Sequence, residues 1–116
     1  MEDVISGLEG ELRSNGVNVE SIDPSGETVD LVYLTAFPDV HVNHQEMGRA
    51  LRTFIDAAEH DEWEPKRVEA TVLRHEDDVQ GTWYAEPEWF RQYLEYDISG
   101  EEFSARVIET LSEDGQ

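Results

Sequence analysis

A nine-residue apolar stretch, residues 29–37, constrains the fold of this chain more than any other feature of its sequence. Taken as a strand, it has two sides: Val29, Leu31, Tyr33, Thr35 and Phe37 on one, and Val32, Leu34 and Ala36 on the other. Both sides are apolar in the middle, whereas a half-exposed strand alternates apolar with polar residues. We therefore predict a central strand of a sheet, covered on both sides.

The remaining periodicities place this strand in a larger order of elements. Apolar residues at helical spacing predict helices near residues 4–15, 44–60, 87–94 and 100–111, and alternating residues predict further strands near 17–22, 68–72 and 79–85. The order is α-β-β-α-β-β-α-α, in which two hairpins flank a helix. It predicts an α+β fold: one two-layer domain over residues 1–116, with a four-stranded, mainly antiparallel sheet and helices packed on it. Residues 1–2 and 113–116 are expected to fray.

Capping residues support the predicted helix boundaries. Asn43 followed by Glu46 forms a variant capping box before the second helix, and Ser99 followed by Glu102 forms a full one before the last. Pro87 is typical of the first turn of a helix. The ends of three helices are therefore predicted from local chemistry as well as from periodicity.

Charge is the most unusual property of the composition. The chain has 28 acidic and 8 basic residues, a net charge of −20, and one lysine. Such an excess of one sign destabilises a compact state unless salt screens it. The basic residues are scattered among acids, which argues against nucleic-acid binding, and Arg49 and Arg52 are expected to pair with acids on their own helix. The absence of cysteine excludes disulfides and thiolate metal sites.

We expect no membrane-spanning or secretory signal in the sequence as it stands. The longest apolar run is well short of the roughly 20 residues that span a bilayer, and the acidic N-terminus does not have the pattern of a signal peptide. We expect no membrane segment and a cytoplasmic location.

One loop has a spacing that resembles a metal site. His41 and His44 are three residues apart with Asp39 and Glu46 beside them, and His75 is a distant third candidate ligand. Imidazole and carboxylate groups suit zinc or a similar divalent ion. The alternative is a solvated loop leading into a helix, because short motifs of this kind match by chance.

A second candidate site is the aromatic segment near residue 85. It contains residues of the types that anchor protein interfaces: Trp83, Tyr84, Trp89, Phe90 and Tyr93. The alternative is that they form the hydrophobic core, where a small domain keeps its large side chains. Trp83 and Tyr84 are adjacent on one strand and must point to opposite faces, so one of them is expected to lie at a second interface.

Two resemblances follow from these features. The acidic, lysine-poor composition resembles the proteins of salt-accumulating haloarchaea and their small uncharacterised families. The element order, and the segment Tyr96-Asp97-Ile98-Ser99-Gly100-Glu101-Glu102-Phe103 before the last helix, are similar to the type III secretion chaperone-like and YbjN-like folds. The second resemblance implies a dimeric protein-binding domain without catalytic residues.

The functional prediction rests largely on what the sequence does not contain. It has no nucleophile elbow, no phosphate-binding glycine loop and no dinucleotide fingerprint, so we predict no catalytic residue and no cofactor. The leading hypothesis is a non-enzymatic protein-interaction or regulatory domain with a protein partner or a second copy. The alternatives are a small-ligand or metal-dependent enzyme that uses His41 and His44, and an acidic mimic of nucleic acid.

Overall fold

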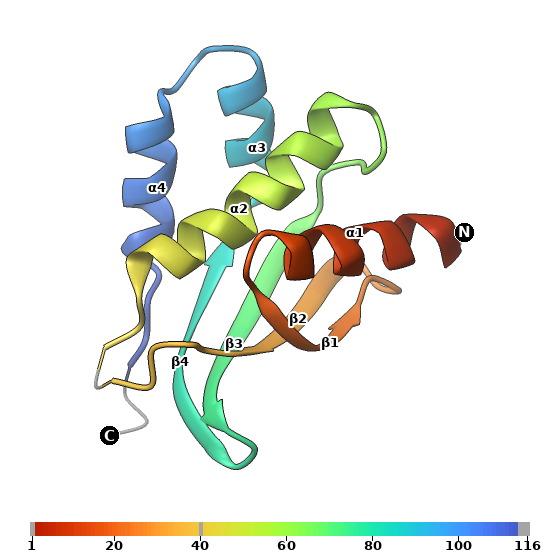
Figure 1. Cartoon of the computed structure of the whole chain (residues 1–116). Helices are drawn as coiled ribbons and strands as arrows, with labels where there is room; N and C mark the ends of the chain where they lie inside the picture. The colour runs from red at the N-terminus through yellow and green to blue at the C-terminus, as the bar shows by residue number, and fades with distance from the viewer. Residues whose placement is uncertain (1, 40, 114–116) are drawn as a thin grey trace.

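A computed structural model of the chain describes residues 2–39 and 41–113, and for residues 2–6 the backbone alone. The helices are α1 (Glu2–Ser14), α2 (His44–Glu59), α3 (Pro87–Leu94) and α4 (Gly100–Ile108). The strands are β1 (Asn18–Asp23), β2 (Thr28–Leu34), β3 (Arg67–His75) and β4 (Asp78–Ala85). The predicted order of elements is confirmed (Figure 1). No described helix is long and apolar enough to cross a membrane.

The sheet has the strand order β1-β2-β3-β4. The two hairpin pairs, β1–β2 and β3–β4, are antiparallel, and the central pair, β2–β3, is parallel. The predicted two-layer fold with a four-stranded, mainly antiparallel sheet is therefore confirmed. The one parallel pair makes the sheet a mixed one. The parallel pair follows from α2, which carries the chain from the end of β2 back to the start of β3 over one face.

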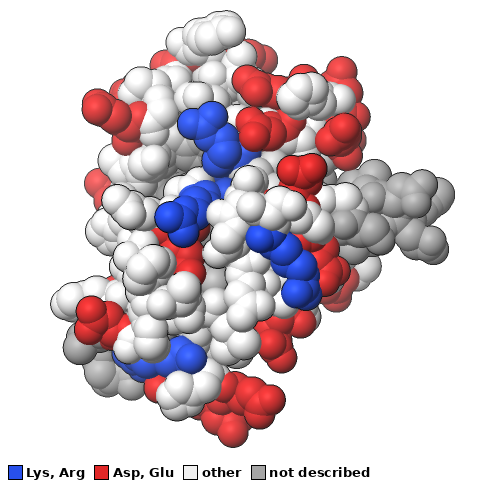
Figure 2. Space-filling view, viewed as in Figure 1, with Lys and Arg blue, Asp and Glu red and all other residues white. Residues whose placement is uncertain are grey.

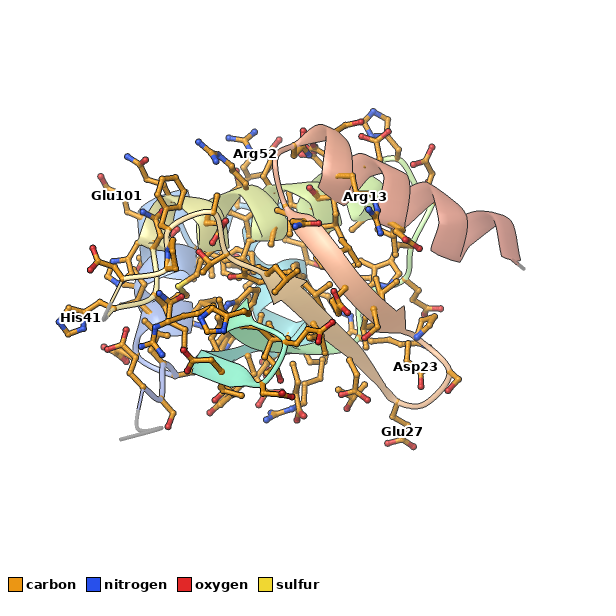
Figure 3. The ribbon with its side chains drawn as sticks, turned by 60° about the horizontal axis from the view of Figure 1, so that its bottom comes forward. Arg13, Asp23, Glu27, His41, Arg52 and Glu101 are labelled. Atoms are coloured by element: carbon orange, nitrogen blue, oxygen red, sulfur yellow. The ribbon has the colours of Figure 1, made fainter. Side chains whose placement is uncertain are left out.

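All four helices lie on that same face (Figures 1 and 3). The core fills the space between the two layers and includes Leu31 and Tyr33 of β2, Val72 of β3, Trp83 of β4 and Phe54 of α2. Within it, the indole Nε1 of Trp83 donates a hydrogen bond to the Tyr33 hydroxyl oxygen at 3.1 Å. Burial raises the pKa of the Tyr33 phenol well above its usual value, so it remains a neutral partner for the indole.

Aromatic rings fix the helices against one another. The Trp63 ring lies 5.0 Å from Phe54 of α2 and 5.2 Å from Phe90 of α3, and Phe90 lies 5.1 Å from Phe103 of α4, each measured between ring centroids. These tilted and edge-to-face contacts are the favourable geometries for aromatic pairs. They tie α3 and α4 to α2.

Local chemistry sets the starts of α3 and α4 as predicted, but the capping box predicted for α2 is only half formed, because the Glu46 carboxylate bonds Thr35 and Ala36 rather than the Asn43 N–H. Asn43 Oδ1 accepts the Glu46 N–H, and Ser99 with Glu102 forms a complete capping box. Pro87 occupies the first turn of α3. Gly16 adopts φ +92° after α1, a left-handed conformation that favours glycine.

The prediction that β2 is covered on both sides is wrong. Val29, Leu31 and Tyr33 face the helices and are buried, but Val32 and Leu34 on the other side are only half-buried. No described helix covers this second side because the crossover through α2 places the helical layer on the first. The strand also ends at Leu34, and the predicted residue Phe37 is 40% exposed.

The ends of the chain differ in part from the expectation of fraying. Residues 1 and 114–116 lie outside the described residues, and Glu2 begins α1. Ser112 instead exchanges two backbone hydrogen bonds with Thr82 of β4, each 2.9 Å long. Glu113 accepts the Val42 N–H at 2.7 Å, so this segment is held along the edge of the sheet.

Candidate functional site

The uncovered face of the sheet is the most distinctive surface of the molecule. Leu73 of β3 is only 9% exposed, yet it does not belong to the main core cluster. It lies beside Leu34 in the parallel ladder and opposite Val79 in the antiparallel one. Together with Val32, these residues form an apolar patch on the side away from the helices, which we call the open face.

An aromatic cluster extends the open face toward α3. Tyr84 points away from the core, and its ring stacks on that of Trp89 with centroids 6.1 Å apart. The Arg67 guanidinium lies 4.0 Å from the Tyr84 ring centroid, a cation–π distance. Arg67 also forms ion pairs with Glu69 and Glu86, which raise the pKa of its guanidinium and keep it charged. The cluster therefore presents a fixed Tyr, Trp and Arg, the residue types that dominate interface energetics.

The charges of the open face lie toward its ends. Thr71 and Thr82 are the pair that faces outward between the aliphatic patch and the aromatic cluster, and both are neutral. Asp30 and Glu69 form an outward pair nearer the start of the parallel strands. In a chain with a net charge of −20, a neutral centre of this kind marks the part of the surface that a partner approaches with least repulsion.

The β4 edge of the sheet is covered by the C-terminal segment, and the β1 edge is interrupted by a bulge and one side-chain contact. Along β4, Ser112 pairs with Thr82, and Thr110 Oγ1 accepts the Tyr84 N–H at 2.9 Å. Along β1, Arg13 donates to the Val19 carbonyl at 2.9 Å, and a register shift leaves Glu20 as a bulge. Blocked, bulged and charged edges disfavour strand addition by another chain.

The aromatic residues predicted as a partner surface divide between core and surface. Trp83 and Phe90 are 1% and 0% exposed and lie in the core, so they are not accessible in this fold. Tyr84 and Trp89 are half-buried and belong to the cluster on the open face. Tyr93 is half-buried in the helical layer, where its ring packs on Phe103. Trp83 and Tyr84 point to opposite faces, as the strand alternation required.

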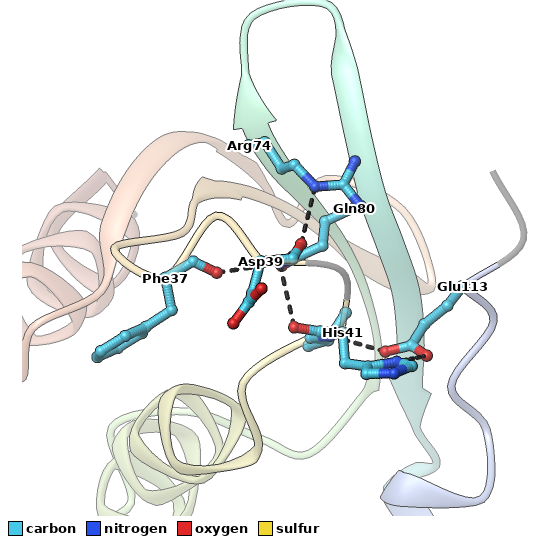
Figure 4. Close-up of polar contacts among 7 residues, drawn as sticks. Phe37, Asp39, His41, Arg74, Gln80 and Glu113 are labelled. Carbon is cyan, nitrogen blue, oxygen red and sulfur yellow. Dashed lines mark hydrogen bonds and ion pairs between the residues drawn. The ribbon is translucent and has the colours of Figure 1, made fainter. Parts of the chain in front are cut away.

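The predicted histidine loop takes part in a different arrangement. His41 Nδ1 lies 3.0 Å from Glu113 Oε1, and the three carbonyl oxygens of Phe37, Asp39 and His41 accept from Gln80 Nε2 (Figure 4). The contact with His41, followed by the Val42 N–H, lowers the pKa of Glu113. These contacts hold residues 37–39 and 41–42 against β4 and the C-terminal segment.

Metal ligation gains no support from this loop. His75 is at the far end of β3, where its Nε2 lies 3.8 Å from Asp78. Over residues 2–39 and 41–113, no group of three His, Asp or Glu is arranged to hold a metal ion. His44, which begins α2, is exposed.

Sequence reasoning did not identify the aliphatic part of the open face. The sequence predicts Val32 and Leu34 on a covered side of β2, because an apolar strand face looks the same in sequence under a helix and under a partner. The neutral residues at the centre of the open face, Val32, Thr71 and Thr82, come from three different strands, so the sequence does not show that they lie together.

Comparisons with known proteins give one match. A family model described as "Domain of unknown function (DUF8159)" matches residues 1–116. Neither a curated protein nor a solved structure matches significantly, so the resemblance to chaperone-like folds stays a prediction.

Proposed function

Because the chain belongs to the DUF8159 family, whose description assigns no activity, we propose its function from the open face: it is a non-enzymatic protein-interaction domain that binds a second copy of itself through that face. One observation carries the proposal. The side of the sheet that no described helix covers carries an apolar patch and an aromatic cluster with the neutral pair Thr71 and Thr82 between them, and the charged pair Asp30 and Glu69 lies nearer one end. Exposed surfaces of this kind are typical of interaction sites.

A second copy fits this surface in shape. Two sheets with the same twist pack face to face about 10 Å apart, with their strands at about −30°. A two-fold axis through the open face superposes the patch on itself, which is the arrangement of most dimers. The neutral centres then meet, while the acidic residues of both copies remain toward the margins.

The size of the open face indicates a weak dimer. Four strands about 4.8 Å apart, with about seven residues each at about 3.3 Å per residue, give a face of roughly 20 by 23 Å. That area is below the ~800 Å² that each partner buries in a standard interface. We therefore expect reversible association that is strengthened by salt, because screening reduces the repulsion between two chains of net charge −20.

The experiment is a measurement of molar mass by light scattering, from about 1 µM to 1 mM protein, in molar KCl. The expected mass rises from 13.3 kDa toward twice that value. Val32→Glu places a charge at the centre of the face and is expected to keep the protein monomeric. The matched control is Ala105→Glu, which adds the same charge at an exposed position on α4.

Two further measurements separate loss of association from loss of folding. Val32→Thr combined with Leu34→Thr removes apolar surface while keeping residues compatible with a strand, and circular dichroism checks that each variant is folded. A mass that stays at 13.3 kDa for the wild type at 1 mM in molar KCl contradicts the proposal. Dimerisation of Val32→Glu with the wild-type affinity also contradicts it.

The halophilic cytoplasm expected from composition is part of this proposal. On the face shown in Figure 2, acidic side chains lie at several separate places, many at the margins and some further in, rather than in one row. That distribution supports a solvated acidic surface over a mimic of nucleic acid, which requires carboxylates at regular phosphate-like spacing.

A further inference from the structure

The helical layer contains a cavity on the side of the molecule opposite the open face. It has a volume of about 470 Å³, which is within the range of small-molecule sites. Four parts of the chain surround it: the turn after α1, the outward side of α2, the end of α3 and the start of α4. Figure 3 shows Arg52 projecting from the side of α2 that faces away from the sheet.

The charge of this cavity has the opposite sign to that of the chain. Arg49 and Arg52 line it, and none of its described lining residues is Asp or Glu, although 28 of the 116 residues in the chain are acidic. Two neighbouring cavities contain acids instead, among them Asp61 and Glu95 in one and Glu102 in the other. The helix-covered face in Figure 2 has basic side chains toward its middle and acidic ones mostly around its margins.

The two guanidinium groups have no partner among the described residues. The predicted pairing of Arg49 and Arg52 with acids of their own helix is not seen among the described residues, and one of those acids, Glu46, turns inward and accepts hydrogen bonds from Thr35 Oγ1 and the Ala36 N–H. Arg52 precedes Asp56 by four residues, which is the less favourable order for a helical ion pair. Four other arginines of the chain do form side-chain contacts, with Glu9, with Glu69 and Glu86, with Asp78 and with Gln92.

The rest of the cavity offers apolar surface and neutral hydrogen-bonding groups. Phe103 and Leu51 are 2% and 5% exposed and form its floor, and Ile55 and Tyr93 line its walls. Gln45 and Ser104 are exposed at the cavity and supply neutral donors.

Gly48 keeps the cavity open. It lies within α2, where glycine costs up to about 1 kcal/mol relative to alanine. A Cβ at this position would meet nothing within 4 Å, so neither the sheet nor another helix requires glycine there. A larger residue at position 48 would extend into the space between the cavity walls.

We propose that this cavity binds the phosphate group of a small phosphomonoester whose organic part packs on Phe103 and Tyr93. Arginines three residues apart on a helix have Cβ atoms about 5–6 Å apart, so both can reach one oxyanion. A phosphomonoester carries a charge of about −1.5 to −2 at neutral pH and three terminal oxygens, which match two guanidiniums and the neutral donors. A carboxylate has one charge and two oxygens and satisfies fewer of these groups.

Calorimetric titration tests the proposal with three probes: phenyl phosphate, benzoate and inorganic phosphate. The titrations use the lowest KCl concentration at which circular dichroism shows the protein folded, because salt screens exposed charges. We expect phenyl phosphate to bind at least ten-fold more tightly than either benzoate or inorganic phosphate. Arg49→Gln and Arg52→Gln are each expected to weaken its binding at least ten-fold.

Two variants control for net charge and for folding. Arg91→Gln removes the same charge from an exposed arginine of α3 that lines the neighbouring acidic cavity, and it is expected to leave binding unchanged. Gly48→Gln fills the space while improving helix propensity, so it is expected to abolish binding in a protein at least as stable as the wild type.

Three results would overturn the proposal. They are no heat with phenyl phosphate, equal affinity for benzoate, and equal losses in Arg52→Gln and Arg91→Gln. Inorganic phosphate binding as tightly as phenyl phosphate would overturn the assignment of the apolar floor to an organic group.

Discussion

The buried carboxylate of Glu46 gives the sharpest test of how this fold is held together. Glu46 is 0% exposed, and its two oxygens accept from Thr35 Oγ1 at 2.6 Å and from the Ala36 N–H at 2.9 Å. These contacts join the first turn of α2 to the chain just after β2, on either side of the crossover loop. The positive end of the helix dipole also favours an anion at this position.

The magnitude follows from these two bonds. Hydrogen bonds to a charged group contribute about 1.5–3 kcal/mol each, and Glu46→Ala also leaves two donors without an acceptor. Removal of a buried charge relieves several kcal/mol of desolvation and offsets part of that loss. We expect a net destabilisation of about 3 kcal/mol, a large fraction of the roughly 5–15 kcal/mol stability of a domain.

Urea unfolding at fixed KCl is the suitable assay, because guanidinium chloride would itself screen the charges. With an m-value of about 1.5–2 kcal/mol/M, the expected shift of the urea midpoint is about 1.5–2 M. Glu101→Ala is the matched control, since it removes an exposed carboxylate from the first turn of α4. That control is expected to change stability by less than about 0.5 kcal/mol.

A double-mutant cycle assigns the effect to the bridge itself. Thr35→Val is expected to cost about 1–2 kcal/mol alone, and its combination with Glu46→Ala is expected to fall short of additivity by about 1 kcal/mol or more. The reasoning is refuted if Glu46→Ala costs no more than Glu101→Ala, or if the cycle is additive.

Three further predictions concern packing, pH and salt. Gly81→Ala is expected to destabilise the fold by about 1–3 kcal/mol, because a Cβ there would lie 2.8 Å from Val42 Cγ2 and 2.9 Å from the Ser112 carbonyl oxygen; an unchanged urea midpoint would contradict this packing. His60 Nδ1 lies 2.8 Å from the Asp56 carbonyl oxygen at the end of α2, a contact that raises the pKa of His60 above 6.5. Its stabilising effect is therefore present in full below pH 6.5 and is lost as the pH rises through the raised value; a His60 pKa at or below 6.5 by NMR titration would contradict it. The net charge of −20 predicts that the unfolding midpoint rises steeply from low salt to molar KCl, and a midpoint independent of KCl would refute the link between charge and stability.

Local chemistry made the element order predictable, but long-range choices were not. Asn43, Ser99 and Pro87 mark helix starts by contacts within a few residues, so the sequence alone located them. The parallel β2–β3 pair depends on where α2 returns the chain, and the sequence left the strand order open. Structure was therefore predictable where contacts within a few residues determine it, as at the helix starts.

The candidate sites show the same limit. Trp83 and Tyr84 had to point to opposite faces, and they do, because the period of a strand is two. Arg49 and Arg52 were expected to pair along their own helix, an inference that assumed every nearby acid was available. Glu46 is not available, because it is bound by groups that lie ten and eleven residues earlier in the chain.

The buried carboxylate thus links the stability of the fold to the charge of its surface. By turning inward, Glu46 joins the start of α2 to the chain just after β2, at the two ends of the crossover loop. The same rotation removes the acid closest to Arg49 on α2, so the helical layer keeps positive charge in a chain that otherwise has little of it. The Glu46→Ala variant and the titrations of Arg49→Gln therefore examine two consequences of one side-chain orientation.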